Sequence, residues 1–483
     1  MKVVLVNPNY HFWKTGSEFL AQALGRQAPL GLLSLASYVK ARLPWVRITI
    51  IDAGLLTLSA RETARRIMAV KPDLVGITVT TVLFNEAKAI ARRLKTESPK
   101  ITVIVGGPHI SGSPAQSLNE CEAFDLAVFG EGEETFKEIL EACRHGRSLA
   151  GLPGVIAQEA RIAGRESNPR KLIHNLDSLP PLAWDLLPGF PRAYKPNIFF
   201  SPGGTMASLT TSRGCPFACR FCDQSTFGRR YRAMSAARVV QDVRTIYEQH
   251  GVSYLVFCDD TFTLDRPRVL EICEGLQGLS LPISWSCDAN VMTIDPAMLR
   301  AMKEAGCWSI SYGIESGSET ILHSLGKKID LSRAREVIGE TRKAGIHAKG
   351  LFILGTPEES RETIKLTQDF LSSVPFSTIN LSKFTPYPGL PLMAEVQGEA
   401  AIDYSRLNGM NFVCPSRHLT ISELEEAYER TLRGFYNTRS AWRTHLGLIL
   451  GGWDNARRFF GIMPGLIGHA IRSKIQTGRG LSR

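Results

Sequence analysis

Apolar runs of strand length alternate with amphipathic helical patterns over the first 145 residues. The runs are "KVVLVNPN", "RITIIDAG", "DLVGITVTT", "ITVIVGGPH" and "DLAVFGEGEE", and patterns such as "SARETARRIMAV" lie between them. Continuous apolar strands separated by helices are typical of a parallel sheet that is covered on both faces. We therefore expect residues 1–145 to form a doubly wound α/β domain, which binds ligands at the carboxyl ends of its strands.

A second alternating series starts near Met206. Its six apolar runs are "MASLTTS", "SYLVFCDD", "ISWSCDAN", "WSISYGIES", "HAKGLFILG" and "STINLSKFTPYP". Six β/α units predict a partial (β/α)6 barrel over residues 201–395, with its chemistry at the carboxyl ends of the strands. The polar, proline-containing residues 146–200 are expected to form an irregular linker, and residues 396–483 a helical, basic region.

Composition narrows the class of protein. The 483-residue chain is 44% hydrophobic and 21% charged, which is typical of a soluble globular protein. It has no run of about 18 apolar residues that could span a bilayer, and its start lacks the features of a signal peptide. We therefore expect a cytoplasmic protein, in which clustered cysteines serve metal binding or catalysis rather than disulfides.

Three cysteines, Cys215, Cys219 and Cys222, lie within eight positions in the loop "RGCPFACRFCDQ". Thiolates at this spacing can hold an iron–sulfur cube, and because a cube has four irons, one iron would stay open to a small molecule. A structural zinc site needs a fourth Cys or His nearby, and the next one is His250, beyond a predicted helix. A chance cluster is the remaining alternative, in a chain with only ten cysteines.

With this loop and the six β/α units, residues 206–392 resemble the radical S-adenosylmethionine (SAM) superfamily. The resemblance implies that Cys215, Cys219 and Cys222 hold a [4Fe–4S] cluster whose open iron binds SAM. It also implies that one electron, from a donor such as a flavodoxin or ferredoxin, cleaves SAM to a 5′-deoxyadenosyl radical.

The resemblance implies further SAM contacts at later strand ends. Phe221 would pack near the adenine, Asp259 and Asp260 would lie near the amino group, Glu315 would contact the ribose, and the strand with Gly350 and Gly355 would back the adenine. Carboxylates accept hydrogen bonds from ammonium and hydroxyl groups, which agrees with these roles. The structural alternatives are a helix N-cap for the Asp pair, a residue before a cap for Glu315, and core packing for Phe221. Many relatives carry an Arg where this chain has Asn290, so the way the third strand meets substrate differs.

The first domain resembles the cobalamin-binding domain often fused ahead of this barrel, through "NPN", "GITVTT", "VGGPH" and "FGEGEE". The resemblance implies cobalamin contacts at the strand ends, at Thr78, Gly106, Gly107, Gly130 and Glu131. Glycine there leaves room for a bulky ligand. The DxHxxG motif, whose His binds cobalt from below, is absent. The nearest match, "NYHFWK", lacks its Asp and Gly, so we expect His11 to be an ordinary loop histidine.

This architecture implies a cobalamin-dependent radical SAM enzyme, whose commonest reaction is methylation of an unactivated carbon. We expect a small hydrophobic substrate, lipid-like or a tetrapyrrole, and no nucleic-acid partner; no residue stands out as catalytic. An alternative is a ring-forming cyclase like the anaerobic magnesium-protoporphyrin monomethyl ester cyclase, whose amino terminus is similar to "NPNYH". An alternative of another class is a non-catalytic cobalamin or SAM sensor. The intact cysteine loop argues against the sensor, because a sensor needs no open iron.

The last 43 residues, 441–483, carry seven Arg or Lys and one Asp, interleaved with Trp442, Trp453, Phe459 and Phe460. Such a segment can lie at an anionic membrane surface, where each basic residue contributes about 1 kcal/mol, or it can form a helical cap over the barrel. If it lies at a membrane, the protein will co-sediment with anionic vesicles at low salt and lose this binding when residues 441–483 are deleted. A cap predicts no vesicle binding and a misfolded barrel after deletion.

Overall fold

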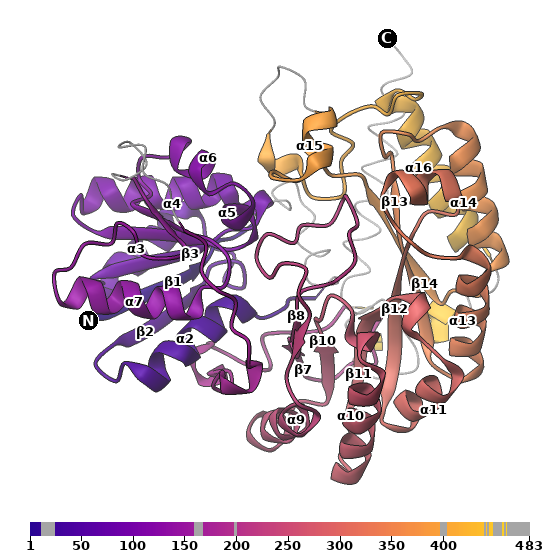
Figure 1. Cartoon of the computed structure of the whole chain (residues 1–483), viewed down its shortest axis with the longest axis horizontal. Helices are drawn as coiled ribbons and strands as arrows, with labels where there is room; N and C mark the ends of the chain where they lie inside the picture. Colours follow the sequence, from indigo (N-terminus) through magenta and orange to yellow (C-terminus); the bar gives the residue numbers. More distant parts are fainter. Residues whose placement is uncertain are drawn as a thin grey trace.

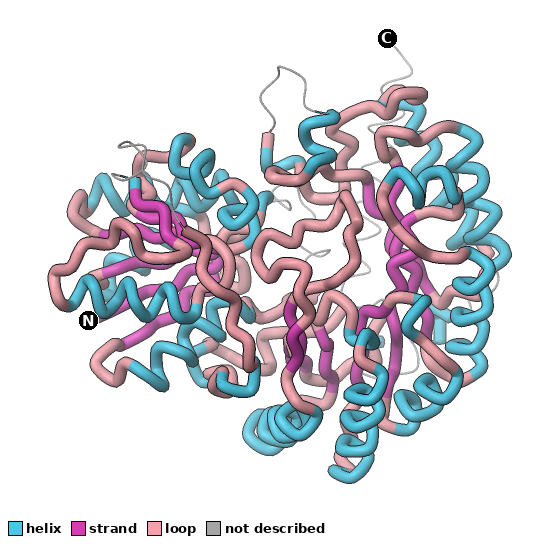
Figure 2. The backbone as a smooth tube through the Cα atoms, viewed as in Figure 1, coloured by secondary structure: helices cyan, strands magenta, loops and turns pink. Residues whose placement is uncertain are grey.

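The computed structural model describes residues 1–10, 25–158, 168–197, 200–396 and 403–438, together with 441, 444–447, 456–457 and 460. Two α/β domains lie side by side, with the amino-terminal domain at one end and the barrel at the other (Figure 1). Loops are concentrated between the two sheets (Figure 2). His11 and most of the basic tail lie outside the described residues.

The first domain is built on a sheet with the order β2-β1-β3-β4-β5-β6 in the described chain. Its strands are β1 (Lys2–Asn7), β2 (Arg47–Asp52), β3 (Leu74–Thr78), β4 (Thr102–Gly106), β5 (Leu126–Val128) and β6 (Val155–Ala157). β1 to β5 pair in parallel and β6 is antiparallel to β5. β1 is buried along "VVLV" because helices cover both faces, which confirms the doubly wound prediction.

The helices of this domain pack an apolar side onto the sheet. They are α2 (Leu30–Arg42), α3 (Ala60–Val70), α4 (Phe84–Glu97), α5 (Pro108–Gly112), α6 (Pro114–Asn119) and α7 (Glu133–Arg144). The start of α3 is set by a capping box, in which Ser59 and Glu62 satisfy each other's backbone N–H groups. The α7 helix begins directly after "FGEG", so the fifth strand end leads at once into a helix.

The second sheet has the order β14-β13-β12-β11-β10-β7. Its strands are β7 (Met206–Leu209), β10 (Tyr254–Phe257), β11 (Ser284–Ala289), β12 (Cys307–Glu315), β13 (His347–Leu354) and β14 (Thr378–Lys383). All adjacent pairs are parallel and follow chain order. The prediction of a partial (β/α)6 barrel is therefore confirmed.

Helices cover the outer face of this curved sheet (Figure 1). They are α9 (Ala236–His250), α10 (Arg266–Leu279), α11 (Pro296–Glu304), α12 (Glu319–Ser324), α13 (Leu331–Lys343), α14 (Arg361–Ser373) and α16 (Ile421–Tyr436), while α15 (Pro391–Val396) lies above the strand ends. The helical carboxyl-terminal region was also predicted, and α16 packs against α14. No helix among the described residues is long and apolar enough to cross a membrane.

The segment between the domains is packed rather than loose. Trp184 and Tyr194 are nearly inaccessible to solvent, and the Tyr194 hydroxyl donates to Asp52 at 3.0 Å. β6 also lies in this segment, past residue 145, and adds an antiparallel edge to the first sheet. Apolar side chains of this segment are buried because they pack between the cores of the two domains. The polar, proline-containing sequence of the segment does not predict this packing.

A second connection runs back from the carboxyl-terminal side of the barrel to the first domain. The rings of Tyr404 and Phe84 meet at 5.4 Å, and the Tyr404 hydroxyl donates to Glu120 at 2.8 Å. Leu407 is fully buried in the same apolar cluster as Phe84. The chain thus touches the first domain on the way into the barrel and again on the way out.

Candidate functional site

The cysteine loop follows β7 and is closed at its base by a short ribbon, β8 (Ser212–Arg213) against β9 (Arg232–Ala233). Gly214 has a φ of +82°, and a Cβ there would lie 2.5 Å from the Arg230 carbonyl oxygen. Only glycine fits this close approach. Within the loop, the Gln224 side chain donates to the carbonyl oxygens of Cys215 and Phe217, at 3.1 and 2.8 Å. The loop is therefore held in shape from both ends.

The three cysteines of the loop lie close enough to influence one another. Burial, Asp260 and the sulfurs of Cys219 and Cys215 raise the pKa of Cys222 to about 12. The pKa of Cys219 is also raised, first by burial. Thiols that lie close to one another and to a carboxylate are harder to deprotonate, unless a cation is bound nearby. Among the described residues, no three His, Cys, Asp or Glu side chains are arranged to bind a single metal ion. A cube does not require such an arrangement, because each of its thiolates binds a different iron.

The two adjacent aspartates at the end of β10 have different surroundings. Asp259 is only 1% exposed, and its carboxylate accepts from the backbone N–H groups of Thr211 and Ser212 and from the Thr211 hydroxyl. These bonds tie β10 to β7, so the expectation that Asp259 contacts SAM is replaced by a structural role. The Asp260 side chain is partly open to solvent and lines a cavity between the two domains. Partial desolvation by the surrounding protein and the charge of Asp259 raise the pKa of Asp260.

Glu315 ends β12 in a left-handed conformation, with a φ of +71°. A glutamate rarely adopts this conformation, which is common at functional sites. Its carboxylate is buried and pairs with Lys327 at 3.1 Å. Burial raises the pKa of Glu315, and Lys327 opposes that rise. One of its oxygens is thus already engaged by the protein.

The structure places the other three residues expected to contact SAM, which are Phe221, Gly350 and Gly355, in different surroundings. Phe221 packs in an apolar cluster with Leu325, Phe384 and Leu392. Gly350 lies in the middle of β13 on its helix-covered side, where a Cβ would lie 2.6 Å from Phe352. Gly350 therefore serves packing on the outer face, and the expectation that its strand backs the adenine stays a prediction. Gly355 does follow the strand end, with a φ of +90°.

A cavity of about 490 Å³ opens between the two domains. From the first domain, its lining includes all five residues predicted for cobalamin: Thr78, Gly106, Gly107, Gly130 and Glu131. From the barrel side it includes Arg213, Gln224 and Asp260, which lie beside the cysteine loop. The carboxyl ends of both sheets therefore face one shared space.

The glycines at the floor of this cavity have different constraints. A Cβ on Gly106 would lie 3.5 Å from the Val128 carbonyl oxygen, which is an ordinary van der Waals contact without a clash. Gly107 has a φ of +104°, and a Cβ there would lie 2.8 Å from the Val79 carbonyl oxygen. Gly106 thus leaves room for a ligand, while Gly107 is required by the backbone itself.

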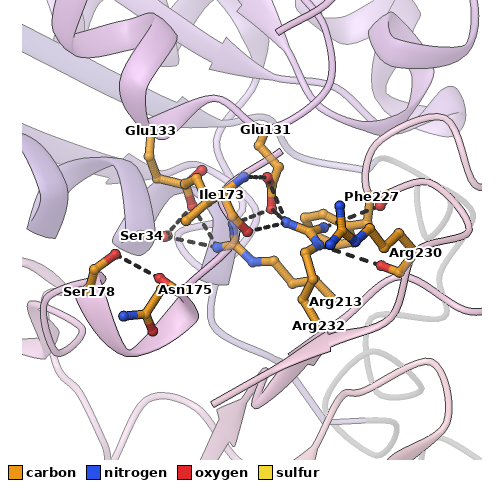
Figure 3. A network of polar contacts seen from close by, with 10 residues as sticks. All are labelled: Ser34, Glu131, Glu133, Ile173, Asn175, Ser178, Arg213, Phe227, Arg230 and Arg232. Atoms are coloured by element: carbon orange, nitrogen blue, oxygen red, sulfur yellow. Dashed lines mark hydrogen bonds and ion pairs between the residues drawn. The ribbon is translucent and has the colours of Figure 1, made fainter. Parts of the chain in front are cut away.

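Glu131 lines the cavity, but its carboxylate is committed to a buried ionic network (Figure 3). Arg213 donates to Glu131 at 2.9 Å and to Glu133 at 2.6 Å, and Arg232 donates to both oxygens of Glu131 at 2.9 Å. Ser34 donates to Glu133 at 2.6 Å. The Glu131 carboxylate thus forms a contact between the domains, since Arg213 and Arg232 belong to the barrel, and the cobalamin contact expected of this residue stays a prediction.

The charges in this network balance, and each one stabilises the others. Although burial opposes it, pairing with Glu133 and Glu131 raises the pKa of Arg213. Although burial opposes it, Arg213 lowers the pKa of Glu133. All four side chains are at most 10% exposed. The sequence analysis missed Arg213, Arg232 and Glu133; the signal available was Arg213 two positions before Cys215.

The linker also contributes to the cavity. Leu179, Pro180 and Leu182, from the stretch "DSLPPL", form part of its wall. Leu30 and Leu35, around the start of α2, line it as well. Sequence analysis missed these residues because their apolar character fits ordinary core packing.

A doubly wound domain and a partial barrel that share a cavity beside a three-cysteine loop define an enzyme with two cofactor sites. Residues 209–371 match the radical SAM superfamily, and residues 18–140 match the B12 binding domain.

An uncharacterised methyltransferase of Pyrococcus horikoshii is 35% identical over 417 residues, covering 84% of this chain and 87% of the relative. The anaerobic magnesium-protoporphyrin IX monomethyl ester cyclase of Rubrivivax gelatinosus is 27% identical, covering 90% and 77%. The structure of the radical SAM methyltransferase TsrM from Kitasatospora setae, with cobalamin and a [4Fe–4S] cluster bound, has a TM-score of 0.68 at 17% identity and covers 90% of this chain and 88% of that one.

The chain belongs to the radical SAM superfamily, among the members that carry a B12-binding domain. It is a cobalamin-dependent radical SAM enzyme, and its cofactors are a [4Fe–4S] cluster, SAM and cobalamin. The residues present fit these groups. The loop offers three thiols and no nearby fourth ligand, and the cavity has an unobstructed glycine floor where a macrocycle needs room.

Replacing any of Cys215, Cys219 or Cys222 by Ala should abolish cluster assembly and SAM cleavage, because in the predicted cluster each thiolate would hold its own iron. Iron and sulfide content after anaerobic reconstitution, with 5′-deoxyadenosine formation, measures this. Cys258→Ala and Cys307→Ala are matched controls that should keep the cluster. A full complement of iron in any of the three loop variants would refute the assignment.

Gly106→Leu should lower the cobalamin content at least tenfold without destabilising the protein, because Gly106 lines the cavity and a Cβ there would make only van der Waals contact with Val128. Gly107→Leu should cost stability as well, since both its φ and its neighbours exclude a side chain. Cobalamin absorbance after reconstitution and the thermal unfolding midpoint separate the two effects. Equal cobalamin binding by Gly106→Leu and the wild type would contradict a ligand at this floor.

Glu131→Gln should lower the free energy of unfolding by about 3–5 kcal/mol, because it leaves two buried guanidinium groups short of a counter-charge. Denaturant unfolding of the reconstituted protein measures this. Arg433→Met is the control: Arg433 is 75% exposed in its pair with Glu429, so its loss should cost no more than about 0.5 kcal/mol. A similar small loss for Glu131→Gln would show that the network does not hold the domains.

Proposed function

We propose that this enzyme transfers a methyl group to an unactivated carbon of a hydrophobic substrate, lipid-like or tetrapyrrole. The observation that carries the proposal is the shared cavity, which brings the strand ends of the B12-binding domain opposite the cysteine loop. The similarity to a methyltransferase over 84% of the chain supports it. The apolar lining residues Leu30, Leu35, Ile77 and Leu209 support a hydrophobic substrate.

In this proposal the bound cofactors supply radical hydrogen abstraction and a transferable methyl group. Cys215, Cys219 and Cys222 hold the cluster. Asp260 accepts a hydrogen bond from the SAM ammonium, and Glu315, which is paired with Lys327, accepts from the ribose. The protein excludes water from the cavity and keeps the donor and acceptor carbons at a fixed separation.

A cyclase reaction is the second candidate, because the cyclase of Rubrivivax gelatinosus is similar over 90% of this chain. The two reactions differ in the atoms that the product gains. Methyl transfer adds a labelled methyl group from SAM, whereas a ring-forming oxidation incorporates oxygen from water.

The deciding experiment incubates the reconstituted enzyme with methyl-labelled SAM, ¹⁸O-labelled water, a flavodoxin or ferredoxin reducing system, and magnesium-protoporphyrin IX monomethyl ester or a lipid extract. We expect 5′-deoxyadenosine together with a product that carries the labelled methyl group. A product labelled only from water would overturn methyl transfer in favour of the cyclase. Absence of any 5′-deoxyadenosine under every condition would indicate a sensor instead.

A further inference from the structure

The inner face of the barrel can be identified from the alternation of exposure along its strands. On β13 the residues alternate between half-exposed and buried along its whole length. Phe352, one of the buried set, contacts Phe370 and Phe376 in the helix-covered core. The alternate set, which includes Lys349, therefore points to the inner face. Asp288 is exposed although β11 lies between two other strands, so it too faces inward.

Three polar residues form a row across this inner face. Asp288 of β11 is in register with Ser311 of β12, and Ser311 is in register with Lys349 of β13. Side chains at paired positions of parallel strands point to the same side, and neighbouring strands lie about 4.8 Å apart. An acid, a hydroxyl and a base thus stand side by side over a span of about 10 Å. We call these three residues the inner polar row.

Aromatic side chains lie below the inner polar row, toward the amino ends of the strands. The rings of Trp308 and His347 meet at 4.6 Å, and those of Phe200 and Trp308 at 4.8 Å. Just below the row, the Tyr254 hydroxyl is 2.8 Å from the Ser286 hydroxyl. The opposite side of the row faces the carboxyl ends of the strands, where Asp260 lines the shared cavity.

The charges of the row are only partly satisfied by the protein. Burial raises the pKa of Asp288, and a hydrogen bond from Ser311 lowers it. Burial lowers the pKa of Lys349, while Asp288 opposes that change. In the described part of the chain, the Lys349 ammonium has no hydrogen bond or salt bridge. A largely desolvated ammonium group without a hydrogen-bond acceptor destabilises a fold, so a role other than stability is called for at Lys349.

We propose that Asp288, Ser311 and Lys349 form a substrate subsite that binds a hydroxyl or carbonyl group of an otherwise apolar substrate. The inference rests on the proposed function in that it places the substrate between this row and the cofactor cavity. A hydroxyl can donate to Asp288 and accept from Lys349 at the same time, which satisfies both. Because the row is neutral overall, it does not favour a phosphate, whose charge Asp288 would repel. A pure hydrocarbon would leave both charges without partners.

A test without substrate compares the thermal unfolding of two double variants of the reconstituted full chain. Asp288→Asn with Lys349→Met should leave the unfolding midpoint unchanged or raise it, because it removes a desolvated lysine that has no hydrogen-bond acceptor together with its neighbouring carboxylate. The matched control is Lys383→Met with Glu425→Gln, a Lys–carboxylate pair with a 2.5 Å contact, which should lower the midpoint. A loss in the row variant as large as in the control would show that the row is structural and overturn the proposal.

A binding test uses phytol and phytane, which share a hydrocarbon skeleton and differ by one hydroxyl. Equilibrium dialysis against the holoenzyme should show phytol binding at least tenfold tighter than phytane, and the Asp288→Asn/Lys349→Met variant should lose this preference. Equal binding of both probes by the wild type, or an unchanged preference in the variant, would overturn the subsite. If neither probe binds, the unfolding comparison decides. Binding is measured without turnover, so a failure of methyl transfer would be seen separately.

Discussion

The geometry of the whole molecule depends on the buried contact of Arg213 and Arg232 with Glu131 and Glu133. Apolar packing is non-directional and would tolerate some sliding between the domains. Hydrogen-bonded ion pairs are directional, and removing one member leaves an uncompensated charge out of water. Arg213 lies two residues before Cys215, and Glu131 follows a glycine of the cavity floor. One contact therefore fixes both the base of the cysteine loop and the floor of the opposite domain.

The cofactors supply the reactivity of this enzyme, and the protein positions and encloses them. Most acidic groups near the strand ends are already used by the fold: Asp259 ties β10 to β7, and Glu315 pairs with Lys327. Asp260 stays open toward the cavity. A cavity with few free titratable groups suits radical chemistry, because reactive intermediates meet few competing partners there.

The architecture and the cysteine loop could be read from the sequence because both leave local signals. Apolar runs with helices between them specify parallel sheets, and three closely spaced thiols have few structural explanations. The structural contacts of Asp259, Gly350 and Glu131 could not be predicted in the same way. Each depends on a residue far away in the chain: Thr211, Phe376 and Arg213 respectively. A position at a strand end indicates that a side chain lies near the site. Only the tertiary contacts show whether that side chain is free to bind a ligand.

The contact of Tyr404 and Leu407 with the amino-terminal domain has a mechanical consequence. Besides the ionic network, that domain is held against the barrel at two further places, by the packed linker before the barrel and by this segment after it. With three separate contacts, the domains cannot rotate relative to each other without breaking at least one of them. Opening the cavity between the domains therefore requires the loss of buried contacts such as the Tyr404–Glu120 hydrogen bond.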